Sequence, residues 1–411
     1  MKLIKINCWD NNIALVSQKN NFIYFELQND SFKCFSPQKF EHELLIKENE
    51  SELDKIGLLS DAISGAYGKD YFYKFHFNHY GKKATLLERL SFIGSFGLGA
   101  IEFAPNKREE KEEICISLNE FKKQSIKVYS GEDSDIAFFI ARSNSGAGGA
   151  KAKGVVRYNI DTKEVILSNS TTTNLKQINA IVKFNTKTGD EAKQLNTQMK
   201  LEYIYYLLAR ESGLKMSDSF LEVDDDNNSY FITKRFDIDS NGEMYHLHSL
   251  AGILSHNAES FTMGYELLFR VALMLGVPKN NMIQIYKNMI FNLIYANRDD
   301  HSRNFSFLMN KDCDWEYAPA YDLTYSGSNV GLAHHQLTIN KGFAKTVKAL
   351  GITKISKLAG IKEPIEIIKE MLSIKHKRLK FLCNKYALSD EIVQEIFDDT
   401  KDIDKRLGDI S

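Results

Sequence analysis

The feature that most constrains this chain is a run of charged residues between two apolar segments. The run ANRDDHSRNFSFL spans residues 296–308 and contains two aspartates, a histidine, two arginines and an asparagine. The apolar spacing of residues 282–296 predicts a helix before it, and residues 305–309 predict an apolar strand after it. So much charge beside surface that must be buried indicates a polar site held by a rigid scaffold.

The spacing of three polar residues indicates what this site could do. Asn304 follows Asp299 by five residues, and Asp322 follows Asn304 by eighteen, after a segment that predicts a hairpin. This matches the order of catalytic and metal-binding residues in protein kinases. Phosphoryl transfer needs an acceptor for the hydroxyl proton, which suits Asp299, and oxygen ligands for Mg²⁺, which Asn304 and Asp322 can supply. Taken alone, aspartates that only cap turns have the same spacing.

A glycine-rich segment and a lysine inside a strand precede this stretch. SNSGAGGAKAKG (143–154) has four glycines between two predicted strands, so its backbone amides could approach phosphate oxygens. A mobile hairpin loop would have the same composition. Lys183 interrupts the apolar predicted strand AIVKF (180–184), which is unusual unless the side chain faces a ligand or a partner.

Two more segments complete the order that a kinase requires. Glu202, on a helix predicted over residues 191–212, is the candidate carboxylate that orients Lys183, although a solvent-exposed glutamate would look the same. ITKRFD (232–237) could link two lobes and offer backbone groups to an adenine edge. The complete order is much harder to obtain by chance than any single part.

Composition and patterning divide the chain into three parts. Residues 1–105 combine short predicted strands with helical stretches, and the charged run NKREEKEE (106–113) marks a boundary. In the second part, residues 106–236, residues 126–190 alternate predicted strands and turns, and DIAFFIARS (135–143) is one of these strands. The predicted helix over residues 191–212 and a predicted hairpin follow. Residues 237–411 are mostly helical in pattern. We therefore expect a β-rich half followed by a helical half.

Charge and hydropathy narrow the class of protein. The net charge of −1 gives no overall basic surface for nucleic acid. No apolar run reaches the roughly 18 residues of a membrane span, and no signal peptide is recognisable. The five cysteines are scattered and form no CxxC pair, so we expect reduced thiols, a cytoplasmic location and no membrane contact.

Taken together, these pieces resemble the HipA-like serine/threonine kinases, which are toxins of bacterial toxin–antitoxin pairs. The matching segments are SFGLGAIEF (95–103), GGAKAK (148–153), AIVKF, ITKRFD, NRDDHSRNFSFL (297–308) and APAYDLT (318–324). The resemblance implies an α+β, bilobal, protein-kinase-like fold with a β-rich N-terminal lobe and an all-α C-terminal lobe. It also implies an extra N-terminal subdomain, which some relatives encode separately.

The resemblance implies ATP and Mg²⁺ as cofactors and gives roles to individual residues. Asp299 would be the catalytic base, Lys183 the phosphate lysine, and Asn304 and Asp322 the metal ligands. Residues 148–153 would form the phosphate loop and residues 234–236 the adenine hinge. The cofactor-binding candidates are Gly148, Gly149, Ala150, Lys153, Lys183, Lys234, Arg235, Phe236, His301, Asn304 and Asp322.

The resemblance also implies partners. These are a helix-turn-helix antitoxin similar to HipB, through which the kinase would meet DNA only indirectly, and a substrate in the translation machinery such as an aminoacyl-tRNA synthetase. One alternative is a kinase-like scaffold that serves mainly as a co-repressor with the antitoxin. Another is a metal-dependent phosphohydrolase that would use His301 together with AHHQ (333–336).

The chain departs from the family pattern at two places. The serine that the family phosphorylates on its own glycine-rich loop falls on Gly146, and the nearest hydroxyls are Ser145 and Ser143. Self-phosphorylation therefore needs a slight shift of register. Asp300 adjoins Asp299, and two buried carboxylates would raise each other's proton affinity, so we expect Asp300 to face solvent or to cap the loop.

Overall fold

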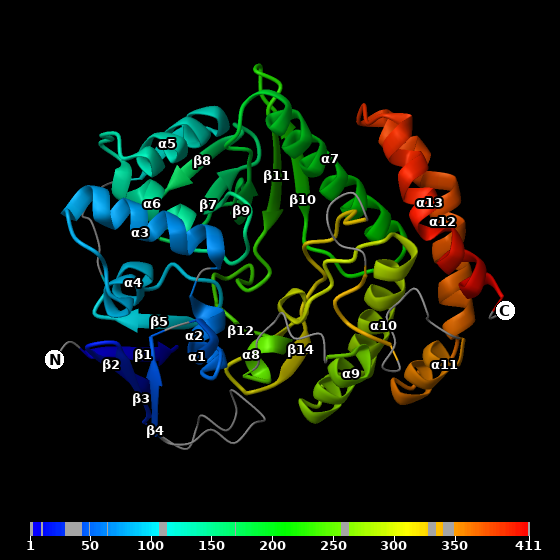
Figure 1. The fold of residues 1–411 in the computed structure, drawn as a ribbon, viewed down its shortest axis with the longest axis horizontal. Helices are drawn as coiled ribbons and strands as arrows, with labels where there is room; N and C mark the ends of the chain where they lie inside the picture. Colours follow the sequence, from blue (N-terminus) through cyan, green and yellow to red (C-terminus); the bar gives the residue numbers. More distant parts are fainter. Residues whose placement is uncertain are drawn as a thin grey trace.

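The computed structural model describes residues 3–9, 11–28, 43–48, 50–63, 65–106, 113–168, 170–255, 263–327, 334–339 and 349–409. Within these ranges it mixes sheets and helices, which confirms the predicted α+β class (Figure 1). The predicted boundary at 106–113 lies mostly outside the described residues, so the division into three parts stays a prediction. Among the residues described, no helix combines the length and apolar character needed to cross a membrane.

The N-terminal part is an antiparallel five-stranded sheet in the order β4-β3-β2-β1-β5. The β2–β3 hairpin turns tightly after Lys19, which pairs with Phe22, and Asn20 takes the left-handed backbone (φ 54°) that such a turn requires. The strands are β1 (Leu3–Cys8), β2 (Asn11–Lys19), β3 (Phe22–Leu27), β4 (Glu43–Lys47) and β5 (Ile101–Ala104). Between β4 and β5 lie α1 (Glu50–Leu53), α2 (Gly57–Ala62), α3 (Ala66–Tyr80) and α4 (Leu86–Ile93).

The central part is a six-stranded antiparallel sheet in the order β10-β11-β9-β7-β8-β6. Its strands are β6 (Ile114–Ser117), β7 (Lys153–Asn159), β8 (Glu164–Leu167), β9 (Gln177–Lys183), β10 (Ser219–Val223) and β11 (Ser229–Lys234). Helices α5 (Leu118–Ser130) and α6 (Ala137–Ser145) pack with α3 on this side of the molecule, and α7 (Gly189–Glu211) packs on β11 (Figure 1).

Residues 135–143 were predicted as a strand, and this prediction is wrong: they enter helix α6. Its apolar residues Phe138, Phe139, Ile140 and Ala141 are consecutive and all buried, between α3, α5 and β7. A helix covered on every side lacks the one-sided apolar spacing that distinguishes a helix from a buried strand. The glycine-rich segment therefore follows a helix rather than a strand.

The C-terminal part is mainly helical and also contains a small sheet, β12-β13-β14. The hairpin predicted between Asn304 and Asp322 is confirmed as β13 (Ser306–Met309) and β14 (Trp315–Tyr317), and β12 (His246–Ser249) completes the sheet. The helices are α8 (Leu250–Ile253), α9 (Tyr265–Met274), α10 (Lys279–Ile294), the 3₁₀ turn η2 (Ser302–Asn304), α11 (Ala349–Leu358), α12 (Pro364–Lys385) and α13 (Asp390–Gly408).

One continuous hydrophobic core joins the first and last parts of the chain. It runs from Ile4 and Ile6 in β1, through Tyr205 in α7, to Ile290 in α10 and Leu407 in α13. A second core, rich in aromatic rings, lies under the six-stranded sheet. The N-terminal sheet therefore shares its core with the helical half. Cys8, Cys115, Cys313 and Cys383 are free thiols, and Cys34 lies outside the described residues.

Candidate active site

The charged run forms a loop that is fixed at both ends. Helix α10 ends at Ile294, and Ala296 turns the chain with a left-handed backbone (φ 49°). The backbone amides of Arg298 and Asp299 both donate to the Ser326 hydroxyl, at 2.7 and 3.0 Å. The apolar helix and the β13 strand therefore deliver Asp299 to a defined position, as the sequence indicated.

The structure brings Asp299 and Asn304 together. The Asn304 side-chain amide donates to the backbone carbonyl of Asp299 (2.7 Å), which leaves the Asp299 carboxylate unused by this bond. That carboxylate is 45% exposed, and His301 Nε2 lies 3.8 Å from it. Burial raises the pKa of Asp299, the nearby His301 lowers it, and Asp322 raises it again, with a net rise. A carboxylate with a raised pKa and an open face suits a general base.

Lys183 forms the centre of a buried charge cluster. Its ammonium contacts Glu202 Oε1 on α7 and lies 2.5 Å from Asp322 Oδ1. The Lys183 and Glu202 side chains are only 7% and 3% exposed. Burial lowers the pKa of Lys183, but the charges of Asp322 and Glu202 outweigh it and raise the pKa, so the ammonium stays charged. This contact between Lys183 and Glu202 is the one that the order of kinase-like segments in the sequence predicted.

Asp322 follows the hairpin and adopts a left-handed backbone (φ 55°). Burial raises its pKa, but Lys183, Lys153 and Lys151 lower it well below the usual range for an aspartate. The carboxylate is therefore ionised at any ordinary pH. This carboxylate and the side-chain oxygen of Asn304 are both of the hard oxygen type that Mg²⁺ prefers.

Lys153 begins β7 directly opposite Lys183 on β9 and is also buried. Its ammonium donates to the Gly148 carbonyl (2.7 Å), which ties it to the glycine-rich segment. Burial and the charge of Lys183 lower the pKa of Lys153 to about 8. Gly149 has a left-handed backbone (φ 94°), and a Cβ there would lie 2.4 Å from the Lys153 ammonium, so this position requires glycine. Gly148, Gly149 and Ala150 are exposed.

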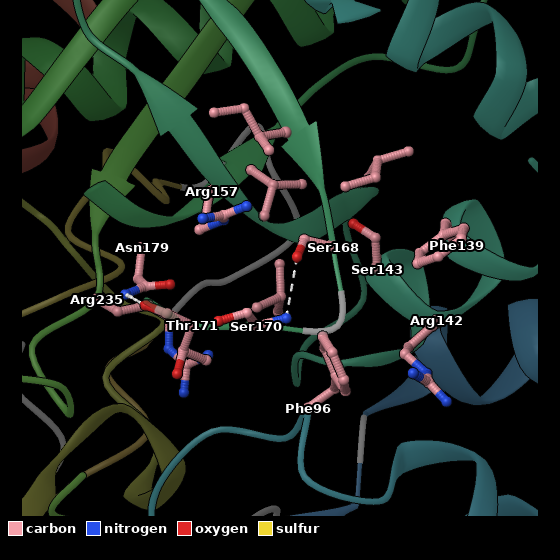
Figure 2. A pocket seen from close by; sticks show the side chains of 14 residues that line it. Phe96, Phe139, Arg142, Ser143, Arg157, Ser168, Ser170, Thr171, Asn179 and Arg235 are labelled. Atoms are coloured by element: carbon pink, nitrogen blue, oxygen red, sulfur yellow. Dashed lines mark hydrogen bonds between the residues drawn. The ribbon is translucent and has the colours of Figure 1, made fainter. Parts of the chain in front are cut away.

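The two serines proposed for self-phosphorylation lie in the last turn of α6. Ser143 and Ser145 are 5% and 1% exposed, and neither hydroxyl has a hydrogen-bond partner among the residues described. Ser143 lines a cavity of about 30 Å³, which Figure 2 shows between α6, β7 and the Phe96 segment. This volume holds little more than a water molecule. Either serine would reach a phosphate only after this turn of the helix opens.

Several donor groups of the predicted hinge, residues 234–236, already form hydrogen bonds within the protein. The backbone amides of Lys234 and Arg235 donate to the carbonyls of Asp218 and Asn179, both at 2.8 Å. The Arg235 guanidinium is buried, and it donates to Asp237 and to the Gly97 carbonyl. An adenine at this segment would therefore find these two amides and the Arg235 side chain already occupied. The Phe236 ring lies 5.6 Å from that of Tyr321.

The expectation that Asp300 faces solvent or caps the loop is wrong. Asp300 is fully buried and accepts hydrogen bonds from the Tyr265 hydroxyl (2.6 Å) and the Gln336 amide (2.7 Å), and His335 Nδ1 lies 2.9 Å away. Successive side chains of an extended loop point in opposite directions, so Asp299 faces outward and Asp300 inward. The AHHQ motif therefore supplies a partner that anchors the loop.

The metal-hydrolase alternative gains no support from the geometry. His335 Nδ1 lies against Asp300, and His301 Nε2 lies 3.8 Å from Asp299. Within the described ranges, no three or more His, Cys, Asp and Glu side chains are arranged to hold a metal ion. A magnesium site built from Asn304 and Asp322 needs no such group.

Two residues that support the site through hydrogen bonds, Tyr321 and Ser326, were not predicted from the sequence. The Tyr321 hydroxyl donates to the Arg303 carbonyl (2.5 Å) and lies 2.6 Å from the Ser306 hydroxyl. Ser326 receives the two loop amides described above. Tyr321 and Ser326 lie one and four residues from Asp322 in the segment PAYDLTYS. Their closeness to a candidate metal ligand is the feature of the sequence that could have identified them.

The comparisons with known proteins agree with this architecture. The model of the HipA-like C-terminal domain matches residues 145–404, well over half of the 411-residue chain. A solved complex described as the Shewanella oneidensis MR-1 toxin–antitoxin system, with HipA, HipB and operator DNA, contains a chain with the same fold. The TM-score is 0.65 at 16% identity, over 98% of this chain and 96% of that one.

A second solved structure, the proinflammatory kinase CtkA of Helicobacter pylori, is more distant. It is 16% identical, the match covers 51% of this chain and 87% of that one, and the TM-score is 0.31. No curated protein matches the chain in sequence.

Proposed function

The chain belongs to the family of proteins with a HipA-like C-terminal domain, and from that premise we propose that it is an ATP-dependent serine/threonine protein kinase. The observation that carries the proposal is the contact of Lys183 with both Glu202 and Asp322, beside the Asp299–Asn304 loop. This contact supports the proposal because phosphoryl transfer in kinases uses a lysine paired with a helix carboxylate, next to an aspartate that can bind metal and a loop aspartate that can act as the base.

Each residue has a defined task in this proposal. Asp299 accepts the proton of the attacking hydroxyl, and the carboxylate of Asp322 and the amide oxygen of Asn304 hold Mg²⁺, which would neutralise charge on the transferred phosphoryl group. Lys183 and Lys153 bind phosphate oxygens, and the backbone of the exposed residues Gly148 and Gly149 approaches them. The rigid contacts around the loop keep these groups in position, which is the main catalytic contribution in this chemistry.

We further propose that the kinase is the toxin of a toxin–antitoxin pair in the cytoplasm. The solved relative is described with HipB and operator DNA, which supports a helix-turn-helix antitoxin as the partner and an indirect link to DNA. The proposed substrate is a component of the translation machinery, such as an aminoacyl-tRNA synthetase. The proposed site of self-phosphorylation is Ser143 or Ser145.

Intact mass spectrometry of the purified chain before and after Mg-ATP tests the kinase proposal, with Asp322→Asn as the control variant. We expect added phosphate on the wild type only, mapped to Ser143 or Ser145. Phosphate mapped elsewhere would keep the kinase and reject these two serines. If the wild type bound ATP but transferred no phosphate to itself or to any protein of a bacterial lysate, the kinase would be rejected in favour of the co-repressor scaffold.

Lys153 makes the affinity for ATP depend on pH. Its ammonium is charged below its pKa of about 8 and attracts phosphate, and the attraction is lost as the pH rises above that value. We therefore expect the ATP affinity of the wild type to be level in neutral solution and to fall in alkaline solution. Titration of a fluorescent ATP analogue over pH measures this. Lys153→Arg, which stays charged, should remove the decline, and a level wild-type profile would contradict the assignment.

A further inference from the structure

Arg303, which directly precedes the proposed metal ligand Asn304, is held by the N-terminal part of the chain. Its guanidinium donates to Asp54 Oδ1 (2.6 Å), to the Ser60 hydroxyl (2.7 Å) and to Asp61 Oδ1 (3.1 Å). Asp54 and Asp61 are 249 and 242 residues away in sequence. The forked guanidinium bridges two carboxylates, a geometry that lysine cannot reproduce.

Asp61 also holds the strand and helix that flank the catalytic hairpin. It accepts hydrogen bonds from the Ser249 amide and the Ser249 hydroxyl (both 2.7 Å), and His248 Nδ1 lies 2.6 Å from it. Burial raises the pKa of Asp61, but His248 and Arg303 outweigh it and lower the pKa, so the carboxylate is ionised. Asp61 therefore connects β12 and the start of α8 to the catalytic loop.

Helix α2, which carries Asp61, packs so closely against α8 that it cannot shift freely. A Cβ on Gly57 would lie 1.8 Å from the Gly252 carbonyl oxygen, and one on Gly252 would lie 2.0 Å from Asp61 Oδ2. Both positions therefore exclude a side chain, and α2 and α8 meet backbone to backbone. Figure 1 shows α1 and α2 beside α8. The Leu250 amide at the start of α8 donates to the Phe305 carbonyl (2.8 Å), one residue after Asn304.

The backbone of Arg303 is held from the opposite direction. Its carbonyl accepts from Tyr321, which directly precedes Asp322. Arg303 is thus fixed by its side chain to the N-terminal part and by its backbone to the segment of the second metal ligand. Asn304 is the next residue, so the same contacts restrict its position.

We propose that Asp54 and Asp61 form a clamp on Arg303, and that through this clamp they are positioning residues for the catalytic loop. By holding Arg303, these N-terminal carboxylates keep Asn304 at the distance from Asp322 that a shared Mg²⁺ requires. The N-terminal part of the chain would then be a working component of the active site. This inference rests on the proposed kinase function and deepens it.

The test measures nucleotide affinity by calorimetry with and without Mg²⁺, using the full chain. The variants are Asp54→Asn and Asp61→Asn, with Asp70→Asn, an exposed carboxylate on α3, as the matched control. Loss of a group that hydrogen-bonds a metal ligand typically costs about 10- to 100-fold in metal affinity or activity. Asp54 and Asp61 act one contact further away, through Arg303, so we expect a loss near the lower end of this range, about 10-fold, in the Mg²⁺-dependent part of the affinity for both clamp variants. The affinity without Mg²⁺ should not change, and Asp70→Asn should match the wild type.

A double-variant cycle separates positioning from general damage to the fold. In Arg303→Gln the clamp is already broken, so adding Asp54→Asn should cause no further loss of Mg²⁺-dependent affinity. Additive losses would overturn the proposal, as would clamp variants that match Asp70→Asn. If Asp61→Asn shows no cooperative unfolding transition, it is not properly folded, and the Asp54 and Arg303 variants then test the proposal alone. A wild type without Mg²⁺-dependent nucleotide binding would instead reject the proposed kinase function itself.

Discussion

Asp299→Asn is expected to lower the rate of phosphoryl transfer by about 10²- to 10⁴-fold, the usual contribution of a general base. The amide has nearly the same shape but cannot take the hydroxyl proton. The loop should keep its form, because Asn304 binds the backbone carbonyl of Asp299 and not its side chain. Initial rates with radiolabelled ATP measure the change, and the affinity for Mg-ATP should stay close to that of the wild type.

The pH profile adds a second measurement of the same residue. The pKa of Asp299 is raised, mainly by burial and by Asp322 against the lowering effect of His301, and only the ionised carboxylate can act as the base. Wild-type transfer should therefore decline on acidification at a higher pH than an ordinary aspartate would give. The residual activity of Asp299→Asn should lack this decline. Asp225→Asn, in an exposed turn, is the control. If Asp299→Asn kept most of the wild-type rate, another residue would have to be the general base.

Local chemistry explains which parts of the site were predictable. The hairpin after Asn304 was predictable because its turn is built from its own residues: Asn310 Oδ1 accepts the amides of Asp312 and Asp314. The Lys183–Glu202 pair was predictable because a charge inside an apolar strand needs a partner, and a helix with a suitable carboxylate follows. In both cases the cause of the structure lies near the residue in sequence.

The features that were missed depend on distant contacts. Helix α6 is buried by α3, α5 and β7, and this complete burial removes the periodicity by which a helix is recognised. Asp300 lies in an irregular loop and Arg303 in the short 3₁₀ turn η2, and in neither does sequence alone set the direction of a side chain. Their partners, His335 and Asp61, belong to other parts of the chain. Only the assembled fold shows that these charges anchor the loop.

Asp322→Asn is expected to change the affinities for Mg-ATP and for metal-free ATP in opposite directions. Asparagine tolerates the left-handed backbone at this position (φ 55°), so the hairpin should remain in place. The substitution removes one negative charge from a site that contains Lys183, Lys153 and Lys151. Metal-free ATP, which is more negatively charged, should then bind more tightly than to the wild type. The enhancement by Mg²⁺ should disappear together with transfer, because the metal loses a carboxylate ligand.

Glu202→Gln provides the matched control, because it removes the same charge from the same lysine without touching the metal site. Lys183 contacts Glu202 and Asp322 from two sides, so both variants should raise the affinity for metal-free ATP. Only Asp322→Asn should abolish the effect of Mg²⁺ in calorimetric titrations. If both variants kept the Mg²⁺ effect, Asp322 would not be the metal ligand. If both lost it, the loss would come from the disturbed position of Lys183, because that lysine is what the two carboxylates share.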